Sequence, residues 1–227
     1  MNRQLIEIAS WRIVSELFRR YPGRFTLIET HPGGGQYDCL TLFQQERKIA
    51  DFNRAGRFHV FDGPGKERPL ELWDMMAQDS DTQGPLDLVC SSLGLEVPAK
   101  LPPSTPEVLV YRFIAAFLSQ ASFQKDRWEC RNGMLDTSGY GGGPVDEYFT
   151  PFPAVREHLK KTLPDDFLNE PAYRYWFILK NGNPVICLQK QGLAWLPEGK
   201  SYELANLYAK EHRIWPVIWD VAGHLLQ

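Results

Sequence analysis

The strongest constraint on the fold is a correspondence between the two halves of the chain, which follow the same order of hydrophobic patterns. Each half begins with apolar residues at helical spacing, continues with strand-like segments and closes with a further helical pattern. The matched segments are 11–18 with 111–118, 24–27 with 127–130, 37–60 with 173–196, and 71–72 with 203–204. We therefore expect an α+β fold of two related units in tandem, each built as a helix, a four-stranded antiparallel meander and a helix.

The unit boundary is expected in the proline-rich segment 97–104, which is typical of a stiff linker. The first unit would then cover residues 1–96 and the second residues 105–227. The first unit predicts strands at 24–30, 37–44, 48–53 and 58–61, then helices from Leu70 onward and at 86–95. In the second unit, Thr105 and Pro106 suit the start of a helix. Asn181-Gly182 suits a type I′ hairpin turn.

The halves differ by an insertion at 137–169, where the first half has only a short glycine loop. Segment 155–161 of this insertion predicts one extra helix. Long excursions of this kind are more often functional than plain connectors.

Composition limits the classes of partner. The net charge of −3 and the pI of about 6.0 give no attraction to nucleic acid or to anionic lipid. The start of the chain has no signal-peptide core and no apolar run is long enough to span a membrane, so we expect a soluble cytosolic protein. The four cysteines (Cys39, Cys90, Cys130 and Cys187) are scattered, which favours reduced thiols over a metal site or disulfides. No cofactor is predicted.

Two triple-glycine segments are the first candidate site. Three consecutive glycines suit a backbone that needs positive φ or the close approach of another chain. In each segment an aspartate follows the last glycine by three residues. The candidate contact residues here are His31, Gly33, Gly34, Gly35, Gln36, Tyr37 and Asp38 in the first segment, and Gly141, Gly142 and Gly143 in the second.

These segments suggest two kinds of chemistry, nucleotide binding and nucleophilic catalysis. Nucleotide binding is disfavoured, because the first loop leads into a strand rather than a helix and Gly65-Lys66-Glu67 lacks the rest of a P-loop. His31, Asp38 and Cys39 could form a nucleophilic site. However, Asp38 and Cys39 point to opposite faces of a strand, and Asp38 could simply bond the amides of its own turn.

The seven tryptophans are mostly expected in the cores, since tryptophan buries a large area. Trp176 and Trp195, on predicted strands, are alternatives for a recognition surface, together with Trp128. The polar residues after Trp128 suit either a groove or solvent; they are Glu129, Arg131 and Asn132.

The chain resembles the TY-Chap family of peptide-binding chaperones, which is named for similarity to type III secretion chaperones and YbjN-like proteins. The resemblance lies in residues 11–20, 29–40, 53–57, 127–133 and 136–143, and extends over nearly the whole chain. It implies a sheet flanked by helices that holds an extended peptide or a partner protein, with no catalytic residues to transfer.

We therefore expect a non-enzymatic module that holds a client peptide or protein on an exposed sheet surface, through backbone pairing and side-chain pockets. Neither nucleic acid nor a membrane is expected as a partner. The alternatives are an enzyme, a hydrolase or transferase that uses His31, Asp38 and Cys39, and a module whose sheets form a homodimer.

Overall fold

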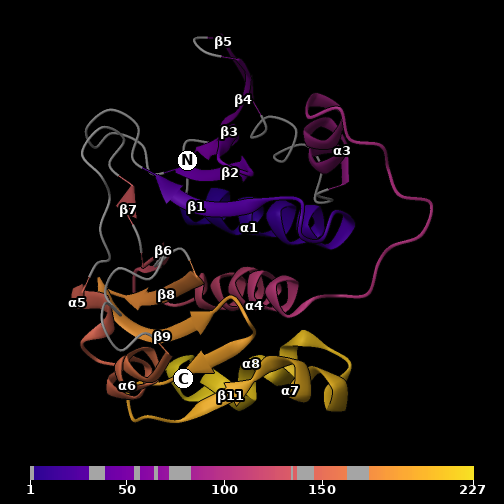
Figure 1. Cartoon of the computed structure of the whole chain (residues 1–227). Helices are drawn as coiled ribbons and strands as arrows, with labels where there is room; N and C mark the ends of the chain where they lie inside the picture. Colours follow the sequence, from indigo (N-terminus) through magenta and orange to yellow (C-terminus); the bar gives the residue numbers. More distant parts are fainter. Residues whose placement is uncertain are drawn as a thin grey trace.

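The computed structural model describes residues 3–30, 39–53, 57–63, 66–71, 83–133, 135–136, 146–162 and 174–227. The first unit contains α1 (Arg3–Arg20), β1 (Thr26–Thr30), β2 (Cys39–Gln44), β3 (Arg47–Asn53), β4 (Arg57–Gly63), β5 (Lys66–Glu71) and α3 (Gln83–Ser92). The second contains α4 (Pro106–Ala121), β6 (Trp128–Asn132), β7 (Leu135–Asp136), α5 (Asp146–Phe149), α6 (Pro153–Thr162), β8 (Tyr175–Lys180), β9 (Asn183–Gln189), β10 (Leu193–Trp195), β11 (Ser201–Glu203), α7 (Leu204–Glu211), α8 (Ile214–Ala222) and the 3₁₀ turn η2 (Gly223–Leu225). The α+β class and the two helix-and-meander units are confirmed (Figure 1).

The described strands form two sheets, ordered β5-β4-β3-β2-β1-β7 and β11-β10-β9-β8-β6. Neighbouring strands are antiparallel except for β1 and β7, which pair in parallel. Strand β7 follows β6 in the second unit but completes the sheet of the first unit. The two units are therefore joined through β7 without sharing one continuous sheet.

The central strands of the two units pair in the same register. Thr41 faces Asp51 across β2 and β3, and the matched residues Phe177 and Cys187 face each other across β8 and β9. Both pairs of strands also contain a register shift at the matched position. The turn between β8 and β9 has the predicted geometry, with φ of 52° at Asn181 and 84° at Gly182.

The helix predicted from Leu70 onward is not observed at Leu70, which lies in β5 opposite Phe58. Cross-strand pairing with β4 overrides the local helical pattern, because strand formation depends strongly on neighbouring strands. The first meander therefore has five described strands rather than four. The other residues of that predicted helix, Trp73 and Met76, lie outside the described residues.

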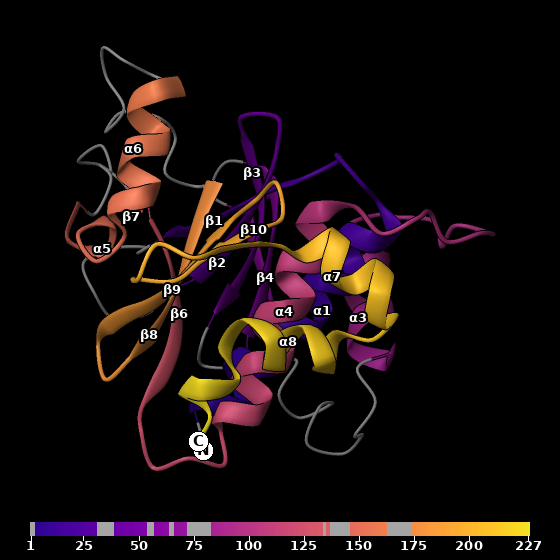
Figure 2. The ribbon, with the colours of Figure 1, turned by 90° about the horizontal axis from the view of Figure 1, so that it is seen from below.

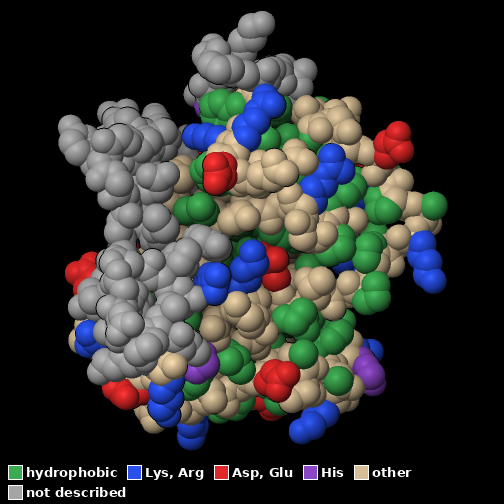
Figure 3. All heavy atoms as spheres, in the orientation of Figure 1, with side chains coloured by type: hydrophobic (Ala, Val, Ile, Leu, Met, Phe, Trp, Pro, Cys, Tyr) green, Lys and Arg blue, Asp and Glu red, His purple; other side chains and the backbone are tan. Residues whose placement is uncertain are grey.

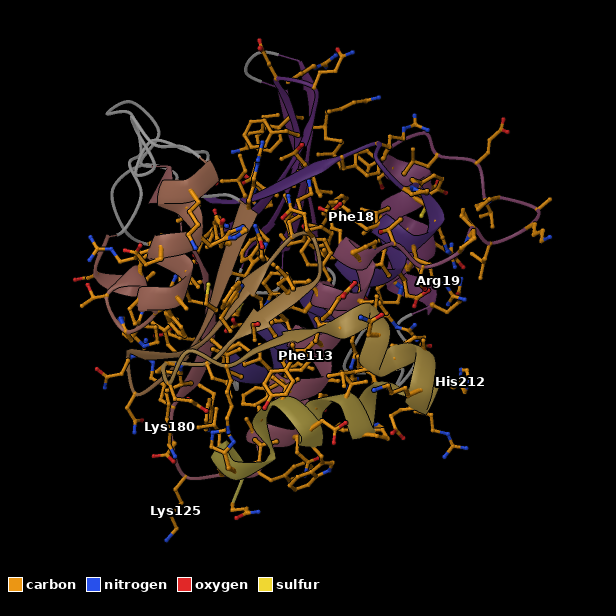
Figure 4. All side chains as sticks on the ribbon, turned by 60° about the horizontal axis from the view of Figure 1, so that its bottom comes forward. Phe18, Arg19, Phe113, Lys125, Lys180 and His212 are labelled. Carbon is orange, nitrogen blue, oxygen red and sulfur yellow. The ribbon has the colours of Figure 1, made fainter. Side chains whose placement is uncertain are left out.

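One hydrophobic core contains residues of both units. Helices α1 and α4 run antiparallel on the same side of the two sheets (Figures 1 and 2). Trp11 on α1 lies with its ring centroid 5.7 Å from Tyr111 on α4 and 4.9 Å from Trp176 on β8. In Figure 4, the Phe113 ring on α4 lies beside α8, whereas Lys125 extends away from the body. The packing of α1 against α4 thus joins the cores of the two units.

The insertion covers the other face of the second sheet. Its predicted helix is present as α6, and α5 precedes it. Phe149, Phe152, Val155 and Leu159 pack there against Phe177 and its neighbours in a second hydrophobic cluster. The second sheet is therefore covered by helices on both faces.

Candidate functional site

The glycine residues of the predicted site (residues 33–35 and 141–143), together with His31, Gln36, Tyr37 and Asp38, lie outside the described residues. The strand ends beside them are described. Strand β1 ends at Thr30, which lies opposite Cys39 at the start of β2 and beside Asp136 at the end of β7. Because β1 and β7 are parallel, the strand ends that precede the two glycine segments, Thr30 and Asp136, lie side by side.

The three candidate tryptophans lie in packed surroundings. Trp128 and Trp176 are buried in the shared core, and the Trp176 ring meets Trp11 edge to face. Trp195 is half-buried, packs against the cluster under α6 and lies 6.0 Å from the His158 ring. Trp128 and Trp176 are therefore not available to a partner in this structure, because both rings fill the space between sheet and helices.

A buried polar network crosses the outer face of the first sheet beside these strand ends. The hydroxyls of Thr30 and Thr41 are hydrogen-bonded to each other, and Thr41 donates to Asp51 at 2.6 Å. Lys48 forms an ion pair with the same carboxylate at 2.8 Å. The matched positions of the second sheet, Phe177 and Cys187, are apolar and lie under the second hydrophobic cluster. The two outer faces therefore differ in chemistry.

A second buried network joins the two sheets where β1 meets β6. The Glu29 carboxylate accepts hydrogen bonds from Arg131 at 2.6 Å and from the backbone N–H of Asn132 at 2.9 Å. Glu7, on α1, accepts from the backbone N–H of Cys130 at 2.9 Å. The expectation that Glu129 and Arg131 lie in a groove or in solvent is corrected here, because Arg131 bridges Glu29 and Glu129 at the junction.

The insertion also reaches this junction through Tyr148 on α5. Burial raises the pKa of the Tyr148 hydroxyl, and the nearby Arg131 guanidinium offsets part of that increase. The Tyr148 ring lies 5.6 Å from Phe177. Tyr148 thus connects the second hydrophobic cluster to the charged network between the sheets.

These contacts leave little room for a guest strand at the described sheet edges. The last two residues of β1 pair with β7 on the edge that faces away from β2. On the free edge of β6, the carboxylates of Glu7 and Glu29 accept hydrogen bonds from backbone N–H groups. At β5, Pro69 lacks an N–H, and the surrounding residues are mostly charged. Prolines and charges are common devices that protect edge strands from pairing. Strand β11 has three residues and runs directly into α7.

Helix α8 carries the largest exposed aromatic surface in the described part of the chain. Trp215 and Trp219 retain 43% and 51% of their accessible area. They lie four residues apart and so on the same side of the helix. The buried residues of α8 are Val217, Ile218, Val221 and Ala222, of which Val217 and Val221 lie opposite the tryptophans. A Cβ at position 223 would come within 2.5 Å of the Trp219 ring, so this ring rests against Gly223.

Trp215 borders a groove of about 240 Å³ between α1, α4 and α8. The helix pair contributes small side chains to the groove, among them Ser15, Ala115 and Ser119, and α8 contributes Ile214 and Trp215. Arg12, Glu16 and Arg112 supply its charges. The groove therefore combines an apolar wall, a floor of small side chains and charged groups.

Sequence reasoning expected most of the seven tryptophans in the cores and did not single out Trp215 or Trp219 as exposed. A usable signal was present. Residues 214–222 are nearly all apolar, and one buried stripe of a helix cannot hold all of them. Trp215 and Trp219 lie together on the part of the helix surface outside that stripe.

Other site types find little support. No group of three or more histidine, cysteine, aspartate or glutamate side chains in the described ranges could hold a metal ion. Among the same residues, no helix combines the length and apolarity needed to cross a membrane. On the face shown in Figure 3, the described basic and acidic side chains are interspersed rather than gathered by sign.

Compared with models of known protein families, residues 8–227 match TY-Chap2, described as "T3SS (YopN, CesT) and YbjN peptide-binding chaperone 2". The resemblance inferred from the sequence is thereby confirmed. Neither the curated proteins nor the solved structures yield a match.

Proposed function

Because the chain belongs to the TY-Chap2 family of peptide-binding chaperones, we propose that it holds a client peptide or protein without making or breaking a covalent bond. We further propose that the client contacts the groove between α1, α4 and α8 together with the two exposed tryptophans of α8. The pair Trp215 and Trp219 carries this proposal, since two large aromatic side chains left in solvent are characteristic of interaction sites.

Recognition through side chains is supported by the state of the sheet edges. Binding by strand addition needs a row of free backbone N–H and C=O groups. Outward N–H groups of β6 are bound by Glu7 and Glu29, and the end of β1 is paired with β7. A client strand would have to displace these buried contacts, whereas the tryptophans of α8 are accessible without any rearrangement.

The glycine segments are a second proposed contact. Their starts at Thr30 and Asp136 lie side by side, which supports the idea that residues 33–35 and 141–143 act together. The variant Gly34→Val tests this idea separately from Trp215→Ala/Trp219→Ala, because it changes a different segment of the chain.

The proposed groove is tested with a random peptide library displayed on phage and selected on the immobilised full chain. Enriched peptides are then measured by fluorescence anisotropy. Trp215→Ala/Trp219→Ala should weaken binding by about 30-fold, which corresponds to the roughly 2 kcal/mol typical of an aromatic hot spot. Phe123→Ala is the matched control, since Phe123 is 86% exposed and does not line the groove.

Three results would contradict the proposal. The first is a selection that enriches no peptide, and the second is a tryptophan double variant that binds as tightly as the unmodified chain. The third is a dimer in analytical ultracentrifugation that the double variant converts to monomer, because the tryptophans would then serve self-association.

A further inference from the structure

The groove beside Trp215 contains two arginines at matched positions of the two units. Arg12 on α1 and Arg112 on α4 correspond in the repeat, and the helices are antiparallel. Residues 12 and 119 lie together, because Arg12 donates a hydrogen bond to Ser119 at 3.2 Å. Both arginines line the same groove, together with the small side chains of Ser15, Ala115 and Ser119.

Both arginines are positioned but neither is neutralised. The Arg112 guanidinium lies 5.9 Å from the centre of the Tyr208 ring, and Arg12 is held by the neutral hydroxyl of Ser119. Within the described part of the chain, neither forms an ion pair. Other arginines of the same helices and sheets do so, such as Arg20 with Asp87.

Among the described residues that line the groove, one has a carboxylate, and that group already has a partner. Glu16 lies 3.5 Å from Arg19 in an ion pair on α1. The local balance is therefore positive, although the whole chain has a net charge of −3. An arginine fork binds carboxylates through paired hydrogen bonds, more strongly than it binds neutral acceptors.

We propose that the client segment bound in this groove carries a carboxylate next to a bulky apolar side chain. Arg12 and Arg112 bind the carboxylate, which belongs to an aspartate, a glutamate or a chain end, and Trp215 and Ile214 cover the apolar side chain. This inference rests on the proposed function and adds the chemical class of the client. A volume of about 240 Å³ suits one or two side chains rather than a whole folded element.

The peptide selection is repeated with Arg12→Ala/Arg112→Ala. The matched control is Arg24→Ala/Arg47→Ala, which removes the same charge from a separate depression beside β1 and β4. On the unmodified chain and on the control, enriched peptides should carry aspartate or glutamate near an aromatic or aliphatic residue. On the groove variant the acidic preference should disappear while the apolar preference stays.

Affinity measurements separate charge from packing. For an enriched acidic peptide, replacing each acidic residue by its amide should raise the Kd by about tenfold, and the groove variant should lose this difference. Added salt should weaken the binding of the acidic peptide much more than the binding of its amide form, because partly exposed charges are screened. The C-terminal carboxylate is distinguished from side-chain carboxylates by comparing free and amidated peptide ends.

The outcomes separate this inference from the proposed function. Peptides that bind through the tryptophans with no acidic preference would overturn the inference and leave the proposed function intact. A preference for basic peptides, or an oligonucleotide that competes and depends on both arginines, would also overturn it. A selection with no enriched peptide at all would overturn both.

Discussion

Replacing Glu29 with alanine should destabilise the protein more than most single substitutions, because this carboxylate lies between the two sheets. Glu29 is 1% exposed. It accepts hydrogen bonds from Arg131 at 2.6 Å and from the backbone N–H of Asn132 at 2.9 Å. The substitution therefore leaves a buried N–H group without its acceptor and a guanidinium without its closest counter-charge.

The size of the effect follows from the surroundings of Arg131. Removing one partner of a buried ion pair costs about 3–5 kcal/mol. Arg131 keeps a contact with Glu129 at 3.3 Å and its side chain is 13% exposed, so water can compensate part of the loss. We expect about 3 kcal/mol of lost stability. At about 2–4 °C per kcal/mol for a chain of this size, the melting temperature should fall by about 6–12 °C.

Urea unfolding followed by circular dichroism measures the change for Glu29→Ala, Arg131→Met and the double variant. The double variant should be less destabilised than the sum of the two single variants by about 2 kcal/mol, since it leaves no unpaired buried charge. Glu129→Ala is the comparison, because this carboxylate contacts Arg131 at the longer distance and should matter less. A loss below about 1 kcal/mol for Glu29→Ala, or strict additivity in the cycle, would refute this account of the junction.

Three further predictions concern the second unit and one partly buried tyrosine. Phe177→Ala should cost about 3–5 kcal/mol and speed hydrogen exchange in α6, because Phe177 is fully buried in the cluster beneath that helix; unchanged exchange would contradict this. In urea unfolding, Gly192→Ala should be more destabilising than Gly199→Ala. Both glycines have positive φ (93° and 86°), but only at 192 would the new Cβ meet Pro106, at 3.0 Å. Equal losses of stability would show that the contact with Pro106 does not matter. The pKa of Tyr21 is raised from 10.0 to about 12, mainly by burial of its hydroxyl. The stability that the protonated hydroxyl contributes is therefore complete below about pH 10 and is lost as the pH rises through about 12. An ultraviolet titration should therefore lack one late-ionising phenol in Tyr21→Phe, and an unchanged titration curve would contradict the assignment.

Local chemistry was sufficient to predict most of the strands. The turn at Asn181-Gly182 has positive φ at both residues, and Asn-Gly is a residue pair that favours this conformation. Alternating apolar residues on either side of a known turn then determine which residues face each other. The hairpin predicted at Asn181-Gly182 is accordingly present between β8 and β9.

Pairings between distant segments could not be predicted in the same way. Strand β7 has two residues and no alternation of its own, and its pairing with β1 depends on where β6 ends. Strand β5 contains a proline and several charges, which argue against a strand unless its position at a sheet edge is known. The carboxylates of Glu7 and Glu29 have no sequence signature, because their backbone donors lie more than a hundred residues away.

Sequence reasoning proposed the two glycine segments as contacts, and this stays a prediction because residues 33–35 and 141–143 lie outside the described residues. It did not identify the groove, because a groove between α1, α4 and α8 depends on how three helices pack. Trp215 is exposed for the same reason, since the contact between α8 and α4 determines which side of α8 is buried.

The outer faces of the two sheets differ in their side chains and in what covers them. In the second unit, the positions matched to Thr41 and Asp51 are Phe177 and Cys187, and α5 and α6 cover them. The insertion and the apolar residues beneath it therefore belong together, since either alone would expose apolar surface or bury polar groups. The α1–α4 groove differs from both faces because each unit contributes a matched arginine to it. A client held there would contact both units at once and would stabilise their packing against each other.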